Sequence, residues 1–222
     1  MYGNQIYYAA IPIPCKSVST IEVLGEGTVA AAPDRALVIL GAITEGKELQ
    51  SVQSENTQIT TDIIQALLDL GIPREHIQTN DYRIEMVYDY PDGKQVFQGY
   101  KLTHLLQITI DQVDQTGYVV DTAVSHGANT VSSIQFSIKE RKRFEIEALS
   151  LAVQNARLKA TAISNSLGTS ISRVPIKVQE LSRSSEPIPV QRTFQSDALV
   201  TPIEPGQLTI YAAVRVWYSQ IT

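Results

Sequence analysis

The chain is poor in the residues that most often mark a chemical site or a covalent framework. Its 222 residues include one cysteine, Cys15, one tryptophan and three histidines. A single cysteine excludes an internal disulfide and any Cys-x-x-Cys motif, and it fits a reducing compartment. The histidines, His76, His104 and His126, do not have the spacing of metal ligands. We therefore expect no metal site, no cofactor-binding residue and no cofactor, and we interpret His104 as a hydrogen-bonded core histidine.

Long apolar runs and an excess of positive charge are also missing. No apolar run approaches the ~20 residues of a membrane-spanning helix. The formal net charge is −5, so we expect no membrane span and no nucleic-acid partner. One dense basic run, residues 139–143, is interpreted as the solvated start of a helix, because no aromatic residues are interleaved with it.

The N-terminal residues 1–16 lack the pattern of a secretion signal. They contain no basic residue before the last position, and Pro12 and Pro14 interrupt the apolar run. Cys15 leaves a lipoprotein site as a minor alternative. We therefore expect residues 1–19 to form a flexible tail and the protein to be cytoplasmic. The alternative is the cell envelope or surface, reached by a non-standard route.

Apolar residues recur at helical spacing in three segments. Helices are expected at 48–70, 114–125 and 142–168, and each is followed or ended by a glycine that can stop a helix. The last helix is the longest and should present an alanine-rich stripe that lets a sheet pack closely. We assign to this stripe Leu149, Ala152, Ala156, Ala160, Ile163 and Leu167.

Strands are predicted between and after the helices, from apolar runs and from strict alternation. Gly25-Glu26-Gly27 is interpreted as a turn, because a strand-like run follows it instead of the helix that a dinucleotide site needs. The run 36–43 is apolar on both faces and should be covered on both sides. We predict an α+β fold with a mixed, mainly antiparallel sheet and helices packed on it, as a two-layer sandwich or as two lobes. The expected strands are 21–24, 36–43, 82–90, 96–110, 131–138, 171–181 and 208–218.

A tyrosine-rich hairpin and a proline-containing loop are the candidate interaction surfaces. Tyrosine rings suit an interface, although the same alternation is equally typical of a half-buried hairpin face. The loop 182–206 is longer than the ~12–15 residues usual for an unstructured connection, so we expect it to be mobile or ordered by a partner subunit. The candidate interface residues are Tyr82, Tyr88, Tyr90 and Tyr100 of the hairpin and Pro202 and Pro205 of the loop.

Short motifs follow one another in a distinctive order along residues 21–220. They are Gly25-Glu26-Gly27, Pro33-Asp34, Asn56, Gly71-Ile72, Ile77-x-Thr79-x-x-Tyr82, Tyr88-x-Tyr90, Gly99-Tyr100, Gly127-Ala128-Asn129, Ile134-x-Phe136-Ser137, Lys159-Ala160, Leu167-Gly168 and Pro202-x-x-Pro205-Gly206. In this order they resemble the SIMPL-domain family, which includes bacterial periplasmic immunogenic and stress-defence proteins. The resemblance implies a compact α+β domain over residues 20–222, no established catalytic residues, and ring-like oligomers in some bacterial members. The chain departs from the family pattern in three ways. It lacks the secretion signal common in bacterial members, it has His104 where asparagine is expected, and it has Gln207 where glutamate is expected.

These observations lead to two hypotheses about function. The first is a non-enzymatic SIMPL-like protein that works as a homo-oligomer, in stress tolerance or envelope organisation. The second is a small-ligand-binding protein or a hydrolase that uses the tyrosine-lined hairpin and the loop at 202–206. A large subunit contact through the hairpin would favour the first hypothesis. A pocket with a strongly perturbed carboxylate would favour the second.

Overall fold

The computed structural model describes residues 19–181, 188–190 and 201–221, which fall into two compact units. We call residues 29–145, 188–190 and 201–210 the hairpin unit. Residues 19–28, 146–181 and 211–221 form the α3 unit. The structure therefore has an α+β fold built on antiparallel sheets, as predicted. The predicted N-terminal tail, except for its last residue, and most of the predicted loop lie outside the described residues.

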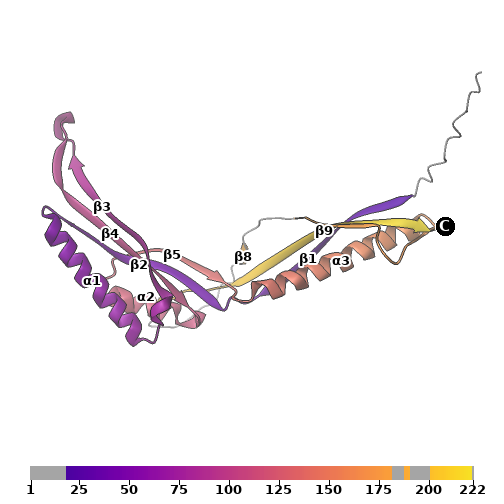
Figure 1. Ribbon diagram of the computed structural model, residues 1–222, viewed down its shortest axis with the longest axis horizontal. Coiled ribbons are helices and arrows are strands. Elements are labelled where there is room, and N and C mark those ends of the chain that lie inside the picture. Colours follow the sequence, from indigo (N-terminus) through magenta and orange to yellow (C-terminus); the bar gives the residue numbers. More distant parts are fainter. Residues whose placement is uncertain (1–18, 182–187, 191–200, 222) are drawn as a thin grey trace, which may run out of the picture. The chain divides into compact units, whose positions relative to one another are not determined.

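The hairpin unit contains a four-stranded antiparallel sheet with the strand order β3-β4-β2-β5. Two helices, α1 and α2, pack on this sheet (Figure 1). Short 3-10 turns join several of these elements, and Gly71 and Gly127 end the two helices with positive φ angles of 86° and 99°. The bounds are β2 Arg35–Gly46, α1 Leu49–Asp69, β3 Ile77–Asp89, β4 Val96–Ile110, α2 Thr116–Ser125 and β5 Thr130–Ser137.

Alternation along β2 and β4 directs one set of side chains towards the helices. Leu40 and Ile108 in the sheet and Ile63 in α1 are fully buried in this core. The other face of β2 is less covered, because Leu37 and Ile39 are only half-buried. The expectation that β2 is covered on both sides is therefore wrong for this unit, where both helices pack on one face of the sheet.

The α3 unit pairs strands with a single long helix (Figure 1). β9 lies between β1 and the short strands β6 and β7, and β8 pairs with the first residues of β9 in the hairpin unit. β1, α3 and β9 each contribute residues to both units. The bounds are β1 Thr20–Ala31, α3 Arg141–Ser166, β6 Ser170–Ile171, β7 Lys177–Leu181, β8 Ile188–Val190 and β9 Gln207–Ile221. Among the described residues, no helix has the length and apolar character needed to cross a membrane.

The buried stripe of α3 differs from the predicted one at its C-terminal end. Ile163 and Leu167 are 40% and 61% exposed, whereas Ser164 is buried. Residues four apart form rows that are inclined to the helix axis, so a buried row drifts around the helix as it follows a twisted sheet. The buried row consists of Ala148, Ala152, Ala156, Ala160 and Ser164.

Gly25 and Gly27 lie inside β1 and do not form the predicted turn. A Cβ on Gly27 would lie 2.6 Å from the backbone nitrogen of Ala152. These glycines therefore allow the strand to approach the helix closely. The turn prediction was wrong because the same Gly-x-Gly motif occurs in turns and in strands that pack closely against a helix.

The edge of β1 is covered by two polar side chains of α3. The Lys159 Nζ donates to the carbonyl of Leu24 at 2.8 Å, and the backbone N–H of Glu26 donates to Asn155 Oδ1 at 3.2 Å. Such contacts satisfy outward-facing backbone groups that could otherwise pair with another strand. This part of the α3 unit is therefore protected from uncontrolled strand addition.

The predicted strand 171–181 is interrupted. In this stretch the two short strands β6 and β7 pair with β9, and they are separated by five residues that include Pro175. Proline has no N–H to donate to a sheet, so it ends regular pairing at that position.

Candidate functional site: the end of the β3–β4 hairpin

The outer end of the β3–β4 hairpin extends past the neighbouring strand. Pairing between β2 and β4 stops at Gly46 and Tyr100. Beyond this point β3 and β4 pair only with each other, to the turn at residues 91–93 (Figure 1). Pro91 begins that turn and Gly93, with φ 74°, closes it, which confirms the predicted turn chemistry.

This end of the hairpin exposes large apolar side chains. Met86 and Tyr90 are 60% and 61% exposed, and the others of the set are more than one third exposed. Soluble monomers rarely expose so many large apolar groups together unless the surface binds something. We call this set the hairpin patch: Tyr82, Ile84, Met86, Tyr88, Tyr90, Val96 and Phe97.

Aromatic side chains in the patch hold one another in place. Phe97 packs edge-on against Tyr88 and Tyr100, with ring centroids 5.8 and 5.2 Å apart. The Tyr88 hydroxyl donates to the sulfur of Met86 at 3.4 Å. A contact surface whose rings are already ordered loses less conformational entropy on binding.

An open groove adjoins the patch where α1 begins. Phe97 and Tyr100 form one wall, and the residues around the first turn of α1, 47–50 and Gln53, form the other. The groove has a volume of about 630 Å³. It is shallow and lined by polar as well as aromatic groups, so it suits part of a protein surface better than an enclosed small molecule.

His104 lies at the base of the hairpin, between α1 and β3. Its ring packs edge-on against Tyr82 at 5.0 Å, and its Nδ1 and Nε2 lie 3.3 and 3.5 Å from the hydroxyls of Thr60 and Thr79. Burial lowers the pKa of His104 below its usual value. These contacts agree with the predicted hydrogen-bonded core histidine.

The Thr60 hydroxyl continues this network into α1 and β2. It donates to Asn56 Oδ1 at 3.3 Å, and Asn56 donates in turn to the Ala42 carbonyl and the Thr44 hydroxyl. Because Thr60 uses its proton for Asn56, it accepts from His104, which places the proton of the neutral ring on Nδ1. The base of the hairpin is thus tied to the helix by neutral polar groups.

The opposite face of the hairpin is charged. Arg83 forms ion pairs with Glu85 and Asp81 at 3.2 and 3.9 Å, and Lys101 pairs with Glu45 at 3.1 Å. These charged side chains are all largely exposed to solvent, so this face of the hairpin is hydrated. Val96, which pairs with Asp89, also lies on this side, so the other members of the hairpin patch that lie in β3 and β4 are on the face opposite these charges.

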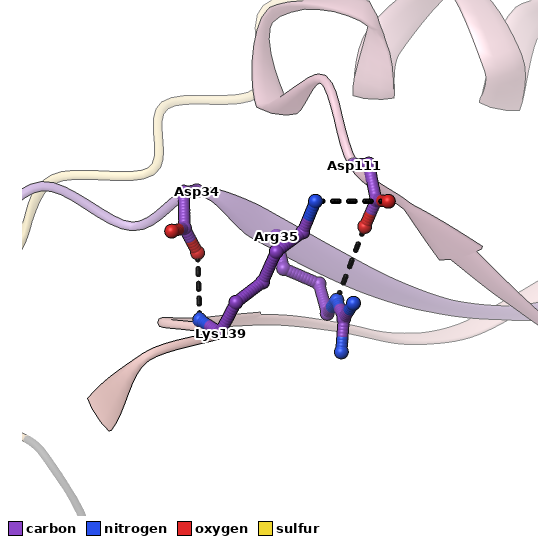
Figure 2. Close-up of polar contacts among 4 residues, drawn as sticks. All are labelled: Asp34, Arg35, Asp111 and Lys139. Atoms are coloured by element: carbon purple, nitrogen blue, oxygen red, sulfur yellow. Dashed lines mark hydrogen bonds and ion pairs between the residues drawn. The ribbon is translucent and has the colours of Figure 1, made fainter. Parts of the chain in front are cut away.

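A second polar cluster joins the ends of three adjacent strands (Figure 2). The Asp111 carboxylate after β4 accepts from Lys139 Nζ at 2.9 Å and from Arg35 Nε at 3.2 Å. The Asp34 carboxylate accepts from the backbone N–H of Lys139 at 2.8 Å. The hydrogen bond from Lys139 is the main cause of a lowered pKa at Asp111, with a further contribution from Arg35. This cluster connects β2, β4 and β5 and serves the fold.

The structure brings together only some of the predicted interface residues. Tyr82, Tyr88, Tyr90 and Tyr100 all lie on the hairpin. The two prolines lie in the segment 201–206, which is attached to α2, away from the hairpin tip (Figure 1).

The attachment to α2 is made by Thr201 and Ile203. The Thr201 backbone N–H donates to Asp121 at 3.0 Å, and its hydroxyl also donates to that carboxylate. Both hydrogen bonds lower the pKa of Asp121, and the bond from the Thr201 hydroxyl has the larger effect. Ile203 packs on the core of the hairpin unit.

Sequence reasoning overlooked part of the patch. Phe97 was not selected, because the register shift between Val87 and Tyr88 that places it opposite Tyr88 cannot be read from alternation. Met86 was placed on the correct face but was not recognised as exposed. Among the described residues, no three His, Cys, Asp or Glu side chains gather in a way that could hold a metal ion.

The sequence over residues 21–218 matches a known protein family. The model of the SIMPL family, described as a protein of unknown function (DUF541), matches residues 21–218. The chain belongs to the SIMPL family. This match covers most of the chain and confirms the resemblance drawn from the ordered motifs.

Several known proteins are similar to the chain in sequence. The 26 kDa periplasmic immunogenic protein of Brucella melitensis is 28% identical over 78% of the chain and 70% of its own length. The uncharacterised protein YggE of Escherichia coli is 23% identical over 86% of the chain and 76% of its own length. The interleukin-1 receptor-associated kinase 1-binding protein 1 homolog of Danio rerio is 26% identical over 74% of the chain and 63% of its own length.

The relatives correct the expected location of this SIMPL protein. The proteins from two Brucella species are named periplasmic, which points to the periplasm. The cytoplasmic location expected from residues 1–16 is therefore contradicted. The missing targeting pattern was a weak guide, and the single cysteine is compatible with an oxidising compartment because it has no second cysteine in the chain to pair with.

Proposed function

We propose that this SIMPL protein works by self-association through the hairpin patch, as a periplasmic assembly that helps to organise the cell envelope. The observation that carries the proposal is the group of seven exposed apolar side chains on one projecting hairpin. Burial of apolar surface is the main driving force of stable association, and tyrosine and methionine are enriched in such contacts. The envelope role follows from the periplasmic names of the Brucella relatives.

The second copy is the occupant that best fits the patch. The patch carries Tyr, Met, Phe and Ile side chains, and the neighbouring groove offers aromatic rings beside polar groups. Two copies of an apolar patch can bury each other, and a two-fold contact between identical chains uses the same patch on both. We also propose that residues 20–222 act as one SIMPL domain, because the family match spans both units.

The alternative of a hydrolase or small-ligand site finds less support. Asp111 and Asp121 are the described carboxylates with shifted pKa values, and both values are lowered. Each carboxylate is occupied by hydrogen-bond donors that connect parts of the fold. Neither lies on the hairpin, and a general acid or base near neutral pH needs a raised carboxylate pKa.

Paired charge changes at the tip test the proposal. The double change Tyr88→Glu and Tyr90→Glu should shift the protein to monomer, because burial of each charged carboxylate in the contact would remove its hydration at a large cost in free energy. Size-exclusion chromatography with light scattering measures the mass, and circular dichroism checks the fold. Tyr118→Glu on α2 is the matched control, since Tyr118 is 54% exposed and lies outside the patch. A folded double variant with the mass of the wild type would move the contact away from the patch.

A further inference from the structure

Met86 is a nucleophilic side chain in an unusual position. It is 60% exposed, and its sulfur accepts a hydrogen bond from the Tyr88 hydroxyl at 3.4 Å. It lies opposite Tyr100 in the strand register and beside the Tyr88–Phe97 ring pair. Met1 is the one other methionine of the chain. The Met86 side chain is therefore largely exposed in the free protein and lies within the surface proposed for self-association.

The chemistry available to this sulfur is oxygen-atom transfer. The thioether sulfur attacks one oxygen of hydrogen peroxide and the O–O bond breaks. The displaced hydroxide takes the proton of the new sulfur-bound hydroxyl and leaves as water, which leaves the sulfoxide. The sulfur is oxidised by two electrons and the peroxide is reduced by two, so that one thioether and one hydrogen peroxide give one sulfoxide and one water. Met86 has the exposure that this reaction requires.

We propose that Met86 is an oxidation site, and that its conversion to the sulfoxide by a peroxide weakens the self-association of the hairpin patch. This inference rests on the proposed function. Oxidation replaces a flexible apolar group by a polar one on a surface that works by excluding water. In the free protein the new S=O group accepts hydrogen bonds from water and from the Tyr88 hydroxyl. In the assembly it is buried among apolar side chains, at a cost that favours dissociation.

Assembly and oxidation should then oppose each other. A second copy on the patch covers the sulfur, so the free protein is the form that reacts. Once oxidised, the free protein has a weaker tendency to assemble. Burial of the sulfoxide oxygen in an apolar contact removes its hydrogen bonds to water. This corresponds to a roughly tenfold or greater rise in the dissociation constant.

The test uses hydrogen peroxide on the full chain in a Cys15→Ser background, which removes the sole thiol. Tryptic cleavage after Arg83 and Lys94 isolates residues 84–94, in which Met86 is the sole sulfur atom, and mass spectrometry follows the gain of one oxygen. Analytical ultracentrifugation of the same samples gives the dissociation constant. Met86→Leu is the matched variant, because leucine keeps the apolar volume and cannot be oxidised. Treatment with a methionine sulfoxide reductase reverses the modification in the wild type.

The expected results form one pattern. Peroxide should oxidise Met86 and raise the dissociation constant in the parent protein, the reductase should restore both, and the Met86→Leu protein should assemble equally with and without peroxide. Complete oxidation at Met86 with an unchanged dissociation constant would overturn the inference and leave the proposed function intact. A parent protein that is monomeric before any peroxide is added would overturn the proposed function, and the inference with it.

Discussion

Gly25 of β1 and Ala156 of α3 face each other so closely that a Cβ on Gly25 would lie 2.7 Å from the Cβ of Ala156. Real side chains almost never approach to this distance, so strand and helix can meet here because neither carries a larger side chain. The row of buried alanines and the two glycines of β1 are thus two halves of one packing arrangement.

Gly25→Ala should therefore destabilise the protein. The added methyl group must push strand and helix apart, and overpacking of this kind typically costs about 1–3 kcal/mol. Urea denaturation followed by circular dichroism measures the change. Thr28→Ala, on an exposed position of the same strand, is the control and should have little effect. Equal midpoints for both variants would show that the strand has room to shift.

A buried charge on α3 should have a larger effect. Ala156 is fully buried and Leu158, two residues on, is 70% exposed. Ala156→Asp places an unpaired carboxylate in the helix–sheet contact and should prevent stable folding, whereas Leu158→Asp should leave the thermal midpoint nearly unchanged. Thermal denaturation of the two variants side by side measures the difference. A wild-type midpoint for Ala156→Asp would refute the buried register.

The difference between predicted and observed stripes shows what the sequence could and could not reveal. Periodicity located α3 and three of its buried alanines correctly. It could not show that Ile163 would be exposed while Ser164 is buried, because that depends on how a helix row follows the twist of the sheet. For the same reason, Gly25 and Gly27 looked like a turn until their partner helix was in view.

His104 should make the stability of the hairpin unit depend on pH. Its pKa is lowered by burial, and the groups that face it from α1 and β3, Thr60, Thr79 and Tyr82, bear no charge near neutral pH to stabilise the imidazolium. The unfolded chain therefore binds the proton more readily than the folded one. Stability should be fully present above about pH 6.5, the ordinary value for histidine, and should fall as the pH drops through the lowered folded value.

His104→Asn tests this origin of the acid sensitivity. The variant removes the titrating group and keeps a side chain that can hydrogen-bond. Urea denaturation at several pH values should give a shallower slope for the variant than for the wild type in the window below about pH 6.5. His76 and His126 are present in both proteins and serve as internal controls. Identical slopes would assign the pH dependence to other groups.

Asp111 should make folding stability depend on pH in a more acidic range than His104 does. Its lowered pKa means that the ionised form is stabilised in the folded state, so its contribution is present above the ordinary aspartate range and lost as the pH falls through the lowered value. Asp111→Asn should reduce the thermal midpoint slightly at neutral pH, and high salt should shrink the difference, because these charges are well exposed. Asp114→Asn, on an exposed neighbouring position, is the control.

The candidate site was only partly predictable from the sequence. Alternation placed Tyr82 and Met86 on one face of the hairpin, because a period of two is a local property of strands. The Pro-Asp-Gly residues placed the turn at 91–93, because turn chemistry is also local. The exposure of Met86 and the pairing of Phe97 with Tyr88 depend on where α1 begins and on a register shift, and both are set by tertiary packing. Pro202 and Pro205 were grouped with the hairpin by sequence, whereas the structure attaches their segment to α2.

The most direct test of self-association is sedimentation velocity of the wild-type chain over a wide concentration series. The account predicts species larger than the 24.5 kDa monomer, with a weight-average mass that rises with protein concentration. It predicts that Tyr88→Glu with Tyr90→Glu sediments as a folded monomer over the same series. A wild-type protein that sediments as a 24.5 kDa monomer at every concentration would contradict the central claim.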